Sequence, residues 1–232
     1  MLTLKDLIRR ARSRLDDENS NDYLWSRQEL LDCINDTVRD AAIRANLKVE
    51  DDLEIPFVQN ADLTWKAKYP LPNGILNVNS VYLLSQPGIT LKRNSFGRLD
   101  QLIHRRPTLL GTPLEYTLDQ TQPGTGEEFG IFIRTITFLG TPIKADTAVL
   151  QTVRLPNLLE FDDDVPEFDD MYHPDLIPGI TGLAYLKKDA DTFDPKRSAR
   201  DLQLFEDRFG FRLPAVVLRD RQTQMPLEMI VG

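Results

Sequence analysis

The spacing of hydrophobic residues changes twice along this chain, and these two changes constrain its fold more than any other feature. Apolar residues recur at helical spacing over residues 2–17 and 26–46, and again over 172–190 and 194–210. Between them, residues 50–155 form short β-rich runs, such as LEIPFVQ and FGIFIRTITFL, divided by Pro, Gly and Asn turns. The order predicts an α+β fold in which helices at both ends flank an inserted β region.

The first helix has an apolar face and a basic face. The face opposite the leucines is basic and carries Lys5, Arg9, Arg10, Arg12 and Arg14. A solvated helix face is one interpretation of this pattern, and a basic strip that meets a partner is the other.

The second helix has a strong start signal at Ser26. Ser26 is the expected N-cap, and Glu29 three residues later completes a capping box. Trp25 and Leu30 occupy the two positions of a hydrophobic staple. The apolar stripe then runs to about Asn46, and Cys33 within it is expected to be a small packing residue, with a reactive thiol as the alternative.

The two closing helices carry proline near their starts. In residues 172–190, Pro178 and Gly179 predict either that the regular helix begins near Pro178 or that it is kinked there. In the last helix Asp194 is the expected N-cap and Pro195 the first helical residue, while Gly210 ends it. The inner stripe of this helix is predicted to be Ala199, Leu202, Phe205 and Phe209.

The middle of the chain predicts an antiparallel β-sandwich or a small β-barrel, because its strands are short and regularly spaced. Residues 96–104 are expected to form a short helix within it, and residues 119–130 a long exposed hairpin loop.

These patterns predict an antiparallel helical bundle, made by the N- and C-terminal helix pairs, with the β-sandwich or barrel module inserted between them. The boundaries are 1–49 for the first helix pair, 50–157 for the β module, 158–210 for the second helix pair and 211–232 for an extended C-terminal arm.

The C-terminal arm has two prolines and no helical stripe, but it is rich in apolar residues. We expect it to dock on a partner or a neighbouring subunit, and the alternative is a tail folded on its own domain. The predicted docking residues are Leu213, Val216, Val217, Leu218, Arg219, Met225, Leu227, Met229 and Ile230.

Composition excludes several classes of protein. The formal net charge of −8 argues against a protein that reads nucleic-acid sequence, because such proteins present a basic face. The single cysteine excludes an intramolecular disulfide. No apolar run approaches 18 residues and no signal peptide is recognisable, so neither a membrane span nor secretion is expected. The expected setting is the cytoplasm, or an assembly built there.

The acidic segment, residues 160–170, is the best candidate for chemistry, since seven of its eleven residues are carboxylates. A metal-dependent phosphodiesterase that uses Asp162, Asp164 and Glu167 is one hypothesis. However, the segment lacks the ligand alternation and the glycine of a calcium loop, and its position before a helix favours an electrostatic role at the helix N-terminus. We therefore predict no catalytic residue, no metal and no cofactor. The candidate acidic lumen or contact surface is Glu160, Asp162, Asp163, Asp164, Glu167, Asp169 and Asp170.

Several motifs in order resemble one known family. The opening LTLKDLIRRARSRLDD and WSRQELLDCINDTVRDAA, the middle YPLPNGILNVNSVYLL, and the closing VPEFDDMYHPDLIPGITGLAYLKKDADTFDP are similar to the head-to-tail connector (adaptor) proteins of tailed bacteriophages. The similarity extends over nearly the whole chain to about residue 213. Pro178-Gly179 departs from the uninterrupted helix expected in that family.

The resemblance implies a structural virion protein without catalysis. Adaptors of this kind form a ring, usually of twelve copies, beneath the portal in the virion neck. They continue the DNA channel without sequence-specific binding and provide the platform for tail or neck proteins. The C-terminal arm would then dock on the portal protein. Another neck ring protein, for head completion or tail termination, is the alternative within the same class, and a chaperone-like binding module is a third.

Overall fold

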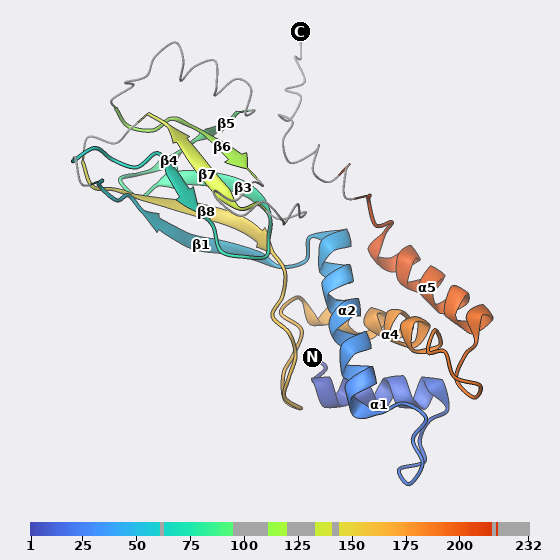
Figure 1. Ribbon diagram of the computed structural model, residues 1–232. Helices are drawn as coiled ribbons and strands as arrows, with labels where there is room; N and C mark the ends of the chain where they lie inside the picture. The colour runs from blue at the N-terminus through green and yellow to red at the C-terminus, as the bar shows by residue number, and fades with distance from the viewer. Residues whose placement is uncertain (61–62, 95–110, 120–132, 141–143, 215–216, 218–232) are drawn as a thin grey trace. The chain divides into compact units, whose positions relative to one another are not determined.

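The computed structural model describes residues 1–60, 63–94, 111–119, 133–140, 144–214 and 217. The chain divides into two compact units: a helical unit of residues 1–48 and 155–212, and a β unit of residues 49–154, to which 213–232 are assigned. The α+β class predicted from the sequence is confirmed (Figure 1). The predicted helix at 96–104 and, apart from Asp119, the predicted loop at 119–130 lie outside the described residues.

In the helical unit, the first two helices start and end where their local sequence signals place them. Helix α1 spans Leu4–Leu15, and Thr3 and Asp6 form a capping box at its start. Helix α2 spans Arg27–Ala45, with the predicted Ser26–Glu29 capping box and Asn46 as its left-handed C-cap. Such caps satisfy backbone N–H groups that a helix leaves without an internal partner.

The third helical stretch fits one of the two sequence-based alternatives, a regular helix that starts near Pro178. A 3₁₀ helix, η1, covers Asp170–Asp175 and leads directly into α4, Leu176–Ala184. Pro178 is therefore the third residue of α4, where a backbone N–H would have no intrahelical partner. The regular helix thus begins two residues before Pro178, which confirms the prediction of a start near that proline, but α4 ends six residues before the predicted residue 190.

Helix α5, Pro195–Phe209, has the predicted Asp194 cap and Pro195 start, and Gly210 ends it. Its predicted apolar stripe is only half right, because Phe205 and Phe209 are buried while Ala199 is exposed and Leu202 is half-buried. Two polar residues, Ser198 and Asp201, take the remaining buried positions. Both have partners on neighbouring helices: Ser198 donates its hydroxyl to the carbonyl of Gly182, and Asp201 accepts hydrogen bonds from Arg14 and Thr181.

Helix α4 lies at the centre of the helical core and contacts α1, α2 and α5. Two glycines allow this close packing. A Cβ atom at Gly179 would lie 2.6 Å from Thr37 Cγ2, and one at Gly182 would lie 2.8 Å from Leu202 Cγ. The fully buried side chains around α4 include Leu4, Leu7, Ile34, Leu176 and Ile180.

The β unit contains two sheets among the described residues. The first has the order β1 (Val49–Pro56), β8 (Thr147–Arg154), β3 (Ile75–Leu83) and β4 (Gln86–Thr90), all antiparallel. The second has the order β2 (Lys68–Pro70), β7 (Thr135–Leu139), β6 (Glu115–Asp119) and β5 (Lys92–Arg93), in which only the β5–β6 pairing is parallel.

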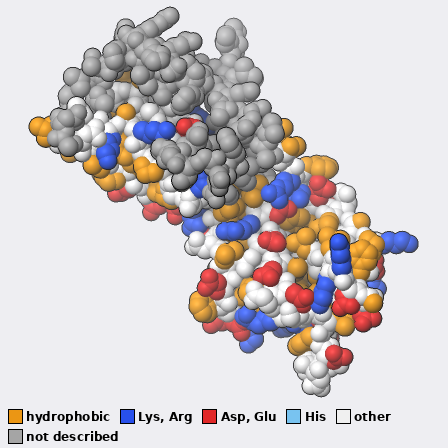
Figure 2. Space-filling model, viewed as in Figure 1, with side chains coloured by type: hydrophobic (Ala, Val, Ile, Leu, Met, Phe, Trp, Pro, Cys, Tyr) orange, Lys and Arg blue, Asp and Glu red, His pale blue; other side chains and the backbone are white. Residues whose placement is uncertain are grey.

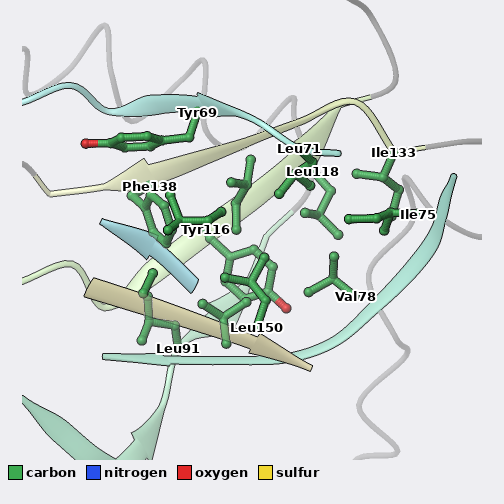
Figure 3. Packing of buried hydrophobic residues seen from close by; sticks show 14 of the residues in the cluster. Tyr69, Leu71, Ile75, Val78, Leu91, Tyr116, Leu118, Ile133, Phe138 and Leu150 are labelled. Atoms are coloured by element: carbon green, nitrogen blue, oxygen red, sulfur yellow. The ribbon is translucent and has the colours of Figure 1, made fainter. Parts of the chain in front are cut away.

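One hydrophobic core draws side chains from both sheets, and Figure 3 shows how they face one another. Strands β6 and β7 contribute Tyr116 and Phe138, while β8 contributes Leu150. Phe57 and Phe138 meet edge to face with ring centroids 5.1 Å apart. The pairing of β1 with β8 places Val49 opposite Val153, so the chain enters and leaves the β unit at neighbouring positions.

Among the described residues, no helix combines the length and the apolar character needed to span a membrane.

Candidate functional site

The acidic segment lies against the start of the first helix. Its backbone carbonyls at Asp164 and Asp162 accept hydrogen bonds from the N–H groups of Leu4 and Lys5, at 2.7 and 3.1 Å. These N–H groups belong to the first turn of α1 and have no partner within the helix. A segment that carries seven carboxylates is thus held at the positive end of the α1 dipole.

Three of the carboxylates are fixed by three different partners. Asp164 accepts the backbone N–H groups of Glu160 and Phe161 at 2.7 and 2.8 Å, and these hydrogen bonds lower the pKa of Asp164. Asp162 pairs with the guanidinium of Arg27 at 2.6 Å. Glu167 accepts two hydrogen bonds from Asn157, at 2.9 and 3.2 Å. The three residues of the phosphodiesterase hypothesis are therefore engaged with separate groups of the protein.

The end of the segment is tied to η1 and to the N-terminus. Asp169 caps η1 by accepting the N–H of Met171 at 3.0 Å. Asp170 accepts a hydrogen bond from the N-terminal ammonium group at 3.0 Å, which lowers the pKa of Asp170.

His173 is completely buried, and both of its ring nitrogens are occupied. Nδ1 accepts the N–H of Leu2 at 3.1 Å, so the proton of a neutral ring lies on Nε2, which donates to the carbonyl of Phe168 at 3.0 Å. This arrangement makes His173 a connector between the N-terminus and the acidic segment. Among the described residues, no three His, Cys, Asp or Glu side chains are grouped so that they could hold a metal ion.

Glu160 and Asp163 remain exposed, and within the described part of the chain neither carboxylate has a partner. They flank Phe161, whose side chain is 72% exposed, and Met171 nearby is 65% exposed. The segment therefore presents free negative charge beside an exposed aromatic side chain.

Two ion pairs with buried carboxylates, which the sequence analysis missed, use residues of the predicted basic strip. The guanidinium of Arg12 contacts Asp17 at 2.5 Å. Arg14 donates to Asp201 at 2.8 and 3.2 Å, and Thr181 donates its hydroxyl to the same carboxylate at 2.6 Å. Arg12 is therefore internal, whereas Arg14 keeps a partly exposed side chain, and Lys5, Arg9 and Arg10 of the strip are exposed to solvent.

Asp201 is the most completely enclosed charged side chain in this network, with no exposed surface. Burial raises the pKa of its carboxyl, but the hydrogen bonds from Arg14 and Thr181 outweigh burial, so the pKa lies below its usual value. No local pattern signals this site, because Arg14 and Asp201 are 187 residues apart.

Cys33 behaves as the small packing residue that the sequence predicts. Burial raises the pKa of its thiol to about 11, which keeps the thiol protonated at neutral pH.

Most of the predicted docking arm lies outside the described residues. Leu213 is half-buried and Val217 is exposed, while Val216, Leu218, Arg219, Met225, Leu227, Met229 and Ile230 are not described. The role of the arm stays a prediction.

In a comparison with protein families, residues 2–229 match the family described as SU10 adaptor protein. No curated protein matches the chain.

Proposed function

The chain belongs to the SU10 adaptor protein family, and from this premise we propose that it is a head-to-tail adaptor subunit of a tailed-bacteriophage virion. In this proposal, copies of the chain form a ring, of about twelve subunits in adaptors of this class, beneath the portal in the virion neck. The ring continues the DNA channel and provides the platform to which tail or neck proteins attach. The observation that carries the proposal is the family match, because it covers both helix pairs and the β unit together.

The charge of the chain supports a role in a DNA channel. Each copy contributes a formal net charge of −8, and the acidic segment concentrates negative charge on one surface. Negative groups on a channel wall repel phosphates, so DNA passes without being held. A structure of the assembled neck would contradict this part of the proposal if it placed residues 160–170 on the outer wall.

The C-terminal arm is the proposed portal-docking element. Its apolar residues, among them Val216, Met225 and Ile230, gain free energy when a partner removes them from water. Deleting residues 213–232 should abolish capture of the portal protein in a pull-down, while the far-UV circular dichroism of the two units is retained. Unchanged capture would show that another surface binds the portal.

Electron microscopy of the full chain mixed with the portal protein tests the function itself. We expect a ring of this protein on the tail-facing end of the portal. A ring that forms without the portal and binds only other neck proteins would instead favour a head-completion or tail-terminator role. A protein that binds a partner without forming a ring would favour a chaperone-like module.

The enzymatic alternative gains no support from the geometry, because Asp162, Asp164 and Glu167 are held by separate partners. Incubation with plasmid DNA and Mg²⁺ or Mn²⁺ tests it directly. Cleavage that Asp164→Asn abolishes would overturn the structural assignment in favour of a phosphodiesterase.

A further inference from the structure

Helix α5 carries a row of exposed cationic and apolar side chains that its own unit does not cover. Residues at spacings of three and four lie along one side of a helix. On α5 this side holds Arg197, Arg200, Leu204 and Arg208, with exposed fractions of 51, 68, 43 and 67%. Exposed aromatic residues, Phe193 and Phe211, lie just beyond the two ends of the helix. We call these six residues the α5 row.

Each arginine of the α5 row has an ion-pair partner within the chain but keeps at least half of its side chain exposed. Arg200 lies 3.3 Å from the buried Asp201, which Arg14 and Thr181 also bind. Arg197 lies 3.4 Å from Asp194 and 3.7 Å from Asp16, and Arg208 lies 3.6 Å from Asp175. Long, solvent-exposed ion pairs such as these contribute little to stability. The row therefore offers a partner exposed guanidinium groups around an exposed leucine, Leu204.

The acidic segment has the complementary composition. Glu160 and Asp163 are exposed carboxylates without a partner in the described part of the chain, and Phe161, between them in sequence, is exposed as well. Figure 2 shows hydrophobic side chains interspersed with acidic and basic ones over the surface of the helical unit. Apolar anchors surrounded by opposite charges are the arrangement that gives both affinity and orientation to a protein interface.

The two surfaces cannot meet within one copy. Figure 1 shows α5 on one side of the helical unit and the acidic segment, beside the N-terminus, on the other. A contact between two different patches of identical chains is heterologous, and such contacts generate rings when the rotation closes. This geometry makes a second copy of the chain the fitting occupant.

We propose that the α5 row of one copy docks on residues 158–163 of a second copy, with Phe161 packed against Leu204 and the arginines facing Glu160 and Asp163. The inference rests on the proposed assembly into a ring and names the surfaces that join its neighbouring subunits.

Charge reversal in the full chain, without the portal, tests this contact by sedimentation velocity over a concentration series. Asp163→Lys alone and Arg200→Glu alone should each weaken self-association at least tenfold, because each places like charges opposite one another. The double variant Asp163→Lys/Arg200→Glu should recover it, since the reversed pair is again complementary. Asp191→Lys and Lys188→Glu, the same charge changes at exposed positions outside both surfaces, should leave it unchanged.

Cysteine pairing checks the contact in a second way. In a Cys33→Ala background, an equimolar mixture of Asp163→Cys and Arg200→Cys chains should give a disulfide-linked dimer on mild oxidation, and either variant alone should not. A protein that stays monomeric throughout the series, a double variant that is not rescued, or equal cross-linking of all samples would each overturn the proposal.

These outcomes are separable from those of the proposed function. A ring on the portal that the charge reversals do not disturb would leave the adaptor function standing and remove this contact. Rescue in the double variant, without any ring on the portal, would keep the contact and remove the function.

Discussion

At the scale of single residues, the helical unit depends on polar groups that only the folded chain brings together. Asp201 receives hydrogen bonds from Arg14 and Thr181 in a position with no solvent access. We expect Asp201→Asn to lower the free energy of unfolding by about 2–3 kcal/mol at neutral pH. This is less than a fully buried pair would lose, because Arg14 is partly solvated. Urea denaturation measures the change, and Asp207→Asn, at an exposed position of the same helix, is the matched control.

The pH dependence of that difference identifies its cause. The pKa of Asp201 is lowered in the folded protein, so its contribution is present above the ordinary Asp pKa of about 3.9 and is lost as pH falls through the folded-state pKa. The stability difference between the original chain and Asp201→Asn should therefore shrink below about pH 4. A difference that stays constant down to acid pH would mean that packing, and not the charge, is responsible.

Residues with local signals were predictable, and residues with distant partners were not. Ser26 and Glu29 were found from sequence because a capping box spans only four residues. Ser198 and Asp201 were missed because a polar residue on an apolar stripe looks like an interruption until its partners are known. Ala199 is predicted to lie in the core because it is apolar, but it is exposed, since apolar character alone does not fix the buried face of a helix.

At the scale of elements, α4 packs between α2 and α5 at a distance that only glycine permits. A Cβ at Gly179 would lie 2.6 Å from Thr37 Cγ2 and 2.7 Å from Phe205 Cδ2. We expect Gly179→Ala to destabilise the protein by about 1–2 kcal/mol, because overpacking exceeds the gain in helix propensity. Thermal unfolding measures this. Gly88→Ala, where a Cβ meets nothing within 4 Å, should stay within about 0.5 kcal/mol.

The start of α1 depends on the shape of the acidic segment. Asp164 binds the backbone N–H groups of Glu160 and Phe161, and this turn presents the Asp164 carbonyl to Leu4. Asp164→Ala should therefore speed amide hydrogen exchange at Leu4 and Lys5, whereas Asp163→Ala should not. If both variants exchange alike, the carboxylate of Asp164 does not organise the turn.

The sequence placed the acidic segment correctly before the closing helices but gave no sign of its contact with α1. Its proximity to η1 is a matter of chain order, and Asp169 caps η1 as acidic residues near a helix start commonly do. Its hydrogen bonds to Leu4 and Lys5 join positions about 160 residues apart, as the pairing of Leu4 with Asp164 shows. Backbone-to-backbone contacts of this kind leave no pattern in side-chain identity.

At the scale of the whole molecule, hydrophobic periodicity predicted the α+β class and the positions of most elements. It could not pair the strands, because a run of alternating residues does not specify its neighbour. The order β1-β8-β3-β4 joins the first and last strands of the β unit, and this pairing brings Val49 beside Val153.

That pairing leads to a prediction about independence. Antiparallel neighbours place opposite Cα atoms about 4.5–5.5 Å apart, so a short linker can replace the β unit. Among the described residues, the buried side chains of the main helical core all lie outside 49–154, and those of the β core all lie between Ile55 and Leu150. A variant in which a short Gly-Ser linker replaces residues 49–154 should therefore keep its helical circular dichroism and unfold cooperatively. Gly179→Ala should lower its melting temperature as it does in the full chain. Loss of cooperative unfolding in the linker variant would show that the helices need the β unit to fold.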